Sequence, residues 1–362
     1  MLVIVMISLL FTTFALIAFM ERASNDLLVD QRDALNRRLR AEAYSALEVT
    51  LSVLEVFRGV GNGLRSPSEG WGDPLAFAGY EPGEGRTVRI EFEDESGKIS
   101  LPHVNSNVLT YLFTSWQLPQ SDAEMLADAL MGWMSRSHVL STALSPQYDL
   151  GAIPYEPPGR PMRSYHELAA IEYAREKFYD QDGRPNELWR RFADNVSLLD
   201  FQQPNLNGAK PDSLAVLGQF DEVQRQNLGD YLAGRGIHES QGPAFFQNPT
   251  DAQRIAGPSG NTGAFSTTIS ALRIIVTVME GQTPFRLAAV IAPPGGATTV
   301  DTNATATRTQ ASSAKQPRSG RQARADKAAT ASLGKGGQPQ GDQNLKYPFT
   351  LLEIRENDAI SP

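Results

Sequence analysis

The first twenty residues constrain this 362-residue chain more than any other stretch. Residues 2–20 carry no charge, and as a helix they would span about 28 Å, close to the roughly 30 Å hydrocarbon core of a bilayer. A cleaved signal peptide is an alternative, but the positive start, shorter apolar stretch and small-residue cleavage site typical of one are missing. A buried core helix, the other alternative, would carry more polar positions. We therefore predict a retained transmembrane anchor over residues 1–20.

Residues 21–58 extend this helix beyond the anchor, because no Gly or Pro interrupts them. Leucines recur at spacings of three, four or seven, and charged residues occupy the opposite face, which is the pattern of an amphipathic helix. The apolar face includes Leu28, Leu35, Leu39, Leu47 and Leu51. We predict a stalk helix over 21–58 that leaves the membrane and packs on a folded domain. The Gly- and Pro-rich run that follows ends it.

Overall composition excludes several classes of protein. The net charge of -8 argues against a nucleic-acid-binding surface, which would need a local basic patch. The absence of cysteine excludes disulfides, thiolate metal sites and thiol nucleophiles. The four histidines, at positions 103, 138, 166 and 238, show no metal-binding spacing. No phosphate loop and no nucleophile elbow occurs either, so we predict that the chain is not an enzyme.

The rest of the chain alternates between strand and helix patterns. Residues 86–93 alternate apolar and charged side chains, as in a half-buried strand, and β-rich runs return at 271–279, 285–292 and 347–355. Five segments between them have helical spacing: 107–116, 121–136, 164–178, 186–192 and 222–234. Ser121 and Glu124 fit a capping box at the start of the second.

These patterns predict an α+β fold. A pilin-like long N-terminal helix would pack on an antiparallel sheet built from residues 86–104 and 262–362, and a large all-α domain over 105–261 would be inserted between the two parts. Residues 293–344 are rich in Ala, Thr, Gly, Ser and Gln and have almost no large apolar side chains, so we predict a disordered loop between two strands.

One segment resembles a partial calcium loop. Asp180, Asp182 and Glu187 place three carboxylates around a glycine turn, although a complete EF-hand loop needs more ligands at fixed positions. An ordinary helix-breaking turn is the alternative interpretation, and we favour it. No cofactor is predicted, and calcium stays an open question.

Four motifs, in order, resemble the general secretion pathway protein K family, the large minor pseudopilins of type II secretion systems. They are the N-terminal apolar segment, the turn Asp94-Glu-Ser-Gly-Lys-Ile-Ser-Leu, the run Tyr165-His-Glu-Leu, and the stretch from Pro204-Asn-Leu-Asn-Gly-Ala to Leu217. One departure concerns calcium: family members often carry an acidic cluster at the end of a helix, where this chain has Met131-Gly-Trp-Met-Ser-Arg-Ser-His.

The resemblance implies a single-pass inner-membrane protein with a periplasmic C-terminal domain. It would lie at the tip of the pseudopilus, bind I-type and J-type minor pseudopilins through the stalk leucines named above, and help to initiate the fibre that exports proteins across the outer membrane. Each leucine would contribute roughly 1.5–3 kcal/mol when fully covered. Secreted substrates are a further candidate partner.

Two alternatives compete with this assignment. The first is a membrane-tethered periplasmic module that recognises exported protein without forming a fibre. The second arises because residues 205–235 resemble the helix-hairpin-helix modules of DNA-uptake proteins. The hairpin in this chain, Gly218-Gln-Phe-Asp-Glu, carries two carboxylates that would repel phosphates, so we predict a structural hairpin and no nucleic-acid partner.

Overall fold

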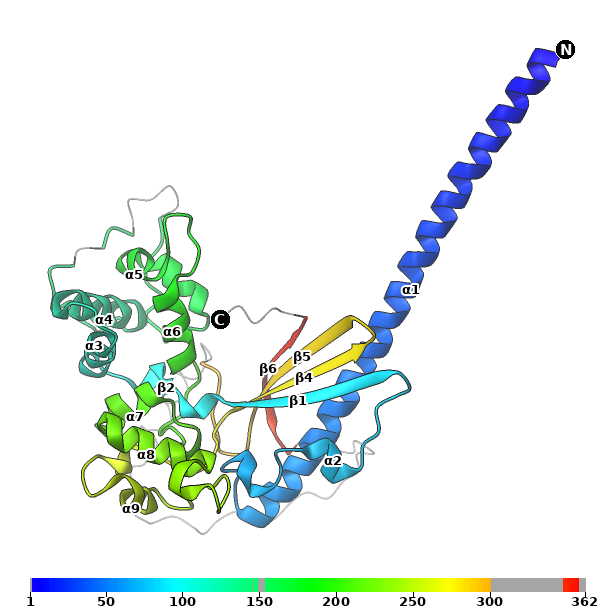
Figure 1. The fold of residues 1–362 in the computed structure, drawn as a ribbon. Helices are drawn as coiled ribbons and strands as arrows, with labels where there is room; N and C mark the ends of the chain where they lie inside the picture. Colours follow the sequence, from blue (N-terminus) through cyan, green and yellow to red (C-terminus); the bar gives the residue numbers. More distant parts are fainter. Residues whose placement is uncertain (1, 145, 149–153, 301–347, 358–362) are drawn as a thin grey trace, which may run out of the picture.

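The fold is taken from a computed structural model that describes residues 2–144, 146–148, 154–300 and 348–357, without most of the side chains of residues 2–32. A long helix, a four-stranded sheet and a helical insertion make up the molecule (Figure 1). The predicted α+β arrangement is confirmed: the helix packs on an antiparallel sheet, and the insertion interrupts the sheet after its first strand.

Helix α1 spans Leu2–Gly61 without a break. Its second half packs on the sheet, while its N-terminal half extends away from the domain (Figure 1). The leucines at positions 39, 47, 51 and 54 are 0–5% exposed and share one core with the inward side chains of the sheet. The short helix α2, Pro74–Ala78, packs beside α1, where Phe57 and Phe77 meet edge to face at 5.2 Å.

The sheet has the order β1-β4-β5-β6 and is antiparallel throughout. Strand β1 is Arg86–Asp94, β4 is Leu272–Glu280, β5 is Thr283–Ala292 and β6 is Thr350–Glu356. All four predicted strands are therefore present. The face toward α1 carries Ile274, Val276 and Leu287, because every second side chain of a strand points to the same side.

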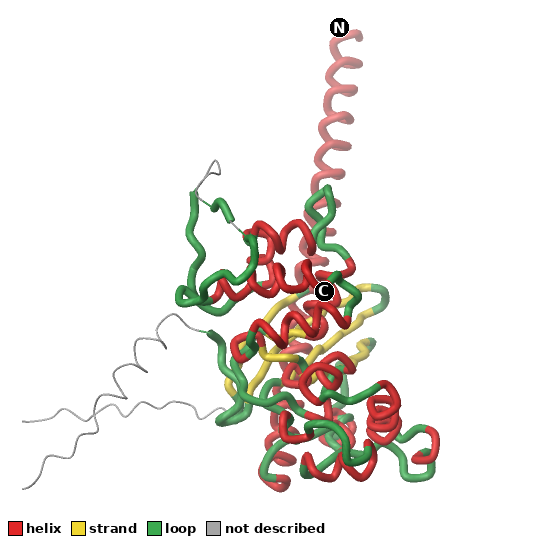
Figure 2. Tube along the Cα trace, turned by 90° about the vertical axis from the view of Figure 1, so that its left-hand side faces the viewer, coloured by secondary structure: helices red, strands yellow, loops and turns green. Residues whose placement is uncertain are grey.

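The insertion between β1 and β4 has two packed parts (Figure 2). The first centres on Phe113, Phe178 and Phe192, and its helices are α3 Ser106–Ser115, α4 Gln120–Met134, α5 Glu172–Phe178 and α6 Glu187–Asn195. The second contains α7 Pro211–Gly218, α8 Glu222–Ala233 and α9 Ala252–Ala256. A short parallel pairing of β2, Ile99–Ser100, with β3, Val196–Ser197, joins the start of the insertion to its middle.

Three local predictions need correction. The capping box at Ser121 is wrong, because α4 begins one residue earlier and Gln120 donates a side-chain hydrogen bond to Glu124 at 2.6 Å. The predicted helix over 164–178 is divided into a 3-10 segment, Tyr165–Ala170, and α5. The predicted loop over 293–344 starts later than expected, because Thr298 exchanges two backbone hydrogen bonds with Asp200. The part of that loop from residue 301 onward lies outside the described residues.

Candidate functional site

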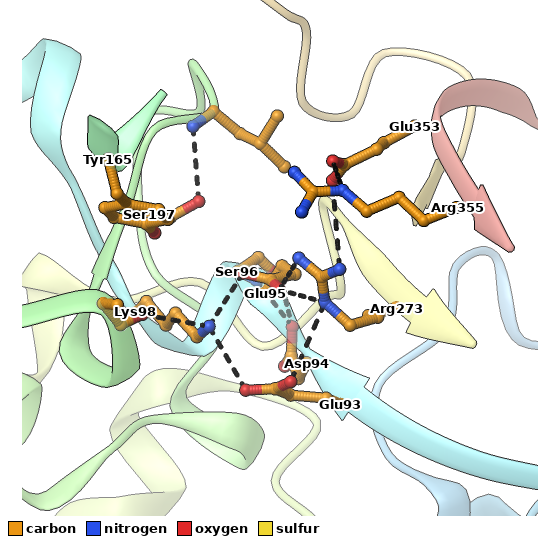
Figure 3. Close-up of polar contacts among 12 residues, drawn as sticks. Glu93, Asp94, Glu95, Ser96, Lys98, Tyr165, Ser197, Arg273, Glu353 and Arg355 are labelled. Atoms are coloured by element: carbon orange, nitrogen blue, oxygen red, sulfur yellow. Dashed lines mark hydrogen bonds and ion pairs between the residues drawn. The ribbon is translucent and has the colours of Figure 1, made fainter. Parts of the chain in front are cut away.

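The Asp94-Glu-Ser-Gly-Lys turn lies where the sheet meets the helical insertion (Figure 3). A 3-10 turn over Glu95–Gly97 ends β1. Asp94 caps this turn, since its Oδ1 accepts from the amide of Ser96 at 2.9 Å and from its hydroxyl at 2.6 Å. The amide nitrogen Nδ2 of Asn205 donates to Asp94 Oδ2 at 2.7 Å. One carboxylate thus fixes the turn and binds it to the Asn205-Leu-Asn-Gly motif, more than a hundred residues away in sequence.

Two glycines allow these motifs to approach each other. A Cβ atom added to Gly97 would lie 1.9 Å from the carbonyl oxygen of Gly208, and one added to Gly208 would lie 2.1 Å from Asp94 Oδ2. Neither position has room for a larger residue, because real Cβ contacts are never so short. The backbones also pair directly: the Asn205 amide donates to the Ser96 carbonyl at 2.8 Å, and the Lys210 amide to the Gly97 carbonyl at 3.2 Å.

Next to this contact lies a buried ion-pair network. The Glu95 side chain is 4% exposed and accepts from Lys98 Nζ at 3.0 Å and from Arg273 Nε at 2.6 Å. Lys98, 7% exposed, also reaches Glu93 at 3.2 Å and the backbone oxygen of Ala193 in α6 at 3.4 Å. The network therefore joins β1, β4 and the helical insertion (Figure 3).

Burial and neighbouring charges shift the pKa values of these groups in different directions. Burial raises the pKa of Asp94 to about 6, and the hydrogen bonds from Ser96 and Asn205 only partly oppose this. Burial would also raise the pKa of Glu95, but the cations of Lys98 and Arg273 outweigh it, and the net pKa is lowered. The pKa of Lys98 is raised, because Glu95 and Glu93 outweigh its desolvation. Glu95 and Lys98 thus remain a charged pair at neutral pH.

The junction is built to hold two parts of a fold together. Glu95, Lys98 and Arg273 are ion-paired and Asp94 is hydrogen-bonded, so these groups stabilise the contact between the sheet and the insertion. Sequence analysis singled out the turn and the motif that contains Asn205, but not the contact between them, and it missed Arg273. The available signal was the arginine at position 273, which is the only charged residue in the run 271–279.

The predicted partner-binding leucines do not form one exposed surface. Leu39, Leu47 and Leu51 are buried under the chain's own sheet, so the prediction that they pack on partner stalks does not hold for these three. Leu35 is partly buried at the edge of the same core. The side chain of Leu28 lies outside the described residues.

Exposed apolar side chains do occur further toward the N-terminus of α1. Met6, Phe14, Leu16, Phe19 and Met20 are 60–71% exposed, on the half of the helix that projects from the domain. In the portion of the chain that is described, no helix combines the length and the apolar character needed to cross a membrane. The anchor over residues 1–20 stays a prediction.

The three candidate calcium ligands are not gathered around one point. Asp180 Oδ1 accepts from the backbone amides of Asp182 and Arg184, at 3.0 and 2.8 Å, which is an ordinary turn. The Glu187 side chain is 92% exposed at the start of α6. Across the residues that the structure describes, no group of three or more His, Asp or Glu side chains could hold a metal ion.

The segment resembling a DNA-binding hairpin consists of α7 and α8. Gln219, with a φ of 54°, ends α7 in the left-handed region, and Asp221 caps α8 in a capping box with Gln224. The Asp221 carboxylate thus faces the helix N-terminus that a phosphate would need to approach. This arrangement agrees with the prediction that the segment is a structural hairpin.

A long N-terminal helix laid on an antiparallel sheet is the architecture of pilin-like subunits, here enlarged by a helical insertion. Residues 94–181, which begin at the junction, match the family model described as type II secretion system (T2SS), protein K. This match confirms the resemblance seen in the sequence. The match supports a role as a minor pseudopilin in type II secretion.

Two further comparisons complete the description. No curated protein matches the chain. A solved structure, the GspK-GspI-GspJ complex from the type 2 secretion system of enterotoxigenic Escherichia coli, contains a chain with 14% sequence identity and a TM-score of 0.49. The match covers 72% of this chain and 93% of that one.

Proposed function

We propose that this chain lies at the tip of the type II secretion pseudopilus and helps to initiate its assembly. The observation that carries the proposal is the free N-terminal half of α1, whose described apolar side chains are more than half exposed. Such side chains need a bilayer or other helices around them, because burying each would contribute roughly 1.5–3 kcal/mol. In this proposal residues 1–20 are anchored in the inner membrane and the folded domain lies in the periplasm.

The shape of the domain supports a terminal position in the fibre. The helical insertion lies away from the N-terminal end of α1 (Figure 1). In Figure 1 the insertion lies beside the sheet, level with the second half of α1, and bulk in this place would obstruct the stacking of another subunit on this one. The match to the protein K family model supports I-type and J-type minor pseudopilins as the partners, which would pack along the stalk.

The test is reconstitution of the complex. We would purify the full chain with the co-encoded I-type and J-type pseudopilins in detergent and measure the mass of the protein by light scattering after size exclusion. A 1:1:1 species is expected. If the chain stays a monomer while the other two associate with each other, the tip assignment fails, and a membrane-tethered receptor becomes the better interpretation.

A further inference from the structure

The sheet has a second face, opposite α1, which we call the outer face. Its side chains alternate with the core residues along each strand. In the strand register, Arg89, Thr277 and Arg286 lie in one row, and Glu91, Ile275, Ala288 and Arg355 form the next. The end of this face near the helical insertion is closed by the junction and by buried Val290. Toward the β4–β5 turn it is open, and Met279 is 40% exposed there.

The open part of the outer face is positively charged on an acidic protein. Its two rows contain three arginines and one glutamate, and when Glu353 of the adjoining row is included the net charge is +1, whereas the whole chain has a net charge of -8. Arg89 pairs with Glu91 at 2.9 Å, and Arg355 pairs with Glu353 in the adjoining row. The sheet surface between the arginines carries the shorter, uncharged side chains of Thr277, Ile275 and Ala288.

Arg286 is the unusual member of this group. Its Nε atom is shielded from solvent and has no hydrogen-bond acceptor. The backbone of Arg286 exchanges hydrogen bonds with Asn357, and no ion pair of its guanidinium occurs among the residues that the structure describes. The buried Nε is out of a ligand's reach, but a guanidinium without an ion pair favours a ligand that brings a carboxylate to its terminal nitrogens.

We propose that the outer face around Arg286 is a docking surface for an acidic segment of a partner pseudopilin. This inference rests on the proposed function, and it adds a contact that does not involve the stalk. Lipid phosphates are a poor alternative ligand. With residues 1–20 in the membrane, residues 21–33 would hold the packed domain about 20 Å away from it, at roughly 1.5 Å per residue.

The experiment compares variants of the full chain in detergent, titrated with the purified I-type and J-type pseudopilins. Arg286→Glu reverses the charge, and Arg286→Gln removes it with less disturbance of the sheet. Arg184→Glu is the matched control, because Arg184 is exposed in the turn between α5 and α6. We expect a dissociation constant raised by about tenfold or more for Arg286→Glu, by less for Arg286→Gln, and by under about twofold for the control. The wild-type constant should also rise with salt concentration.

Several results would separate the two proposals. If the wild-type chain binds but both Arg286 variants bind equally well, the docking surface is refuted and the tip assignment stands. If the wild type does not bind at all, the proposed function itself fails. A further experiment deletes residues 358–362. If Arg286→Glu has no effect on binding in the shortened chain, Arg286 binds the chain's own C-terminal residues, and the inference is overturned. Thermal unfolding of each variant shows whether it is folded.

Discussion

Removing the Lys98 ammonium should be among the most damaging single changes to this fold. In Lys98→Met, Glu95 and Glu93 lose a cation at 3.0 and 3.2 Å. At an effective dielectric constant of about 20, a pair at this distance is worth about 5 kcal/mol, offset by the desolvation that Lys98 no longer undergoes. Because Arg273 still neutralises Glu95, we expect the free energy of unfolding to fall by about 3 kcal/mol.

Urea unfolding of the full chain in detergent, extrapolated linearly to water, measures this loss. Lys210→Met is the matched control: its side chain is 36% exposed and lies 3.7 Å from Glu93, so we expect a cost of at most about 0.5 kcal/mol. The double variant Lys98→Met/Glu95→Gln should show coupling of at least about 1 kcal/mol. A cost below about 1 kcal/mol for Lys98→Met, with no coupling to Glu95, would refute the idea of a dry, interdependent junction.

Three further predictions concern stability. The pKa of Asp94 rises from 3.8 to about 6 on folding, so the folded state binds the proton of this carboxyl more tightly than the unfolded state does. The contribution of Asp94 to the free energy of unfolding therefore falls as the pH rises from about 4 to 6. Asp94→Asn should reduce this pH dependence, as measured by urea unfolding at a series of pH values. Gly97→Ala should lower the free energy of unfolding, measured by calorimetry, by more than about 2 kcal/mol. Gly59→Ala, in a helix and with open space around it, should raise the free energy of unfolding by about 0.5–1 kcal/mol. Equal effects of the two substitutions would contradict the close contact between Gly97 and Gly208. Leu39→Ala should lower the free energy of unfolding by about 2–5 kcal/mol, whereas Val60→Ala should hardly change it, because Val60 is 86% exposed. If Val60→Ala lowered the free energy of unfolding as much as Leu39→Ala, Val60 would belong to the core.

The architecture was predictable because its signals are periodic. Three patterns each indicate a face that must be buried. They are the alternation in residues 86–93, the leucine spacing along the stalk and the β-rich runs near the C-terminus. Boundaries were less certain: Ser121 has the chemistry of a cap, but Pro119 and Gln120 start the helix earlier. Local preferences of this kind are easily overridden by the packing around them.

The junction was only half predictable. The Asp94 turn stands out in the sequence, but its partners come from segments that are distant along the chain, and nothing in the spacing says that Arg273 faces Glu95. The leucine stripe was ambiguous in a different way. An apolar face shows that a helix packs on something, yet it does not distinguish the chain's own sheet from a neighbouring subunit, and the sheet covers Leu39, Leu47 and Leu51.

The insertion of a helical unit between β1 and β4 has a consequence for how the chain folds. Asp94 and Leu272 are register partners, although 178 residues separate them. Closing so long a loop at random is slow, and pairings of high sequence separation are reached late in folding. If the insertion forms first around its own aromatic core, the Asp94 turn and the start of β4 are brought together at its base. The interruption would then act as a template that aligns β1 with β4, and a variant with a weakened insertion should refold slowly even where the sheet itself is intact.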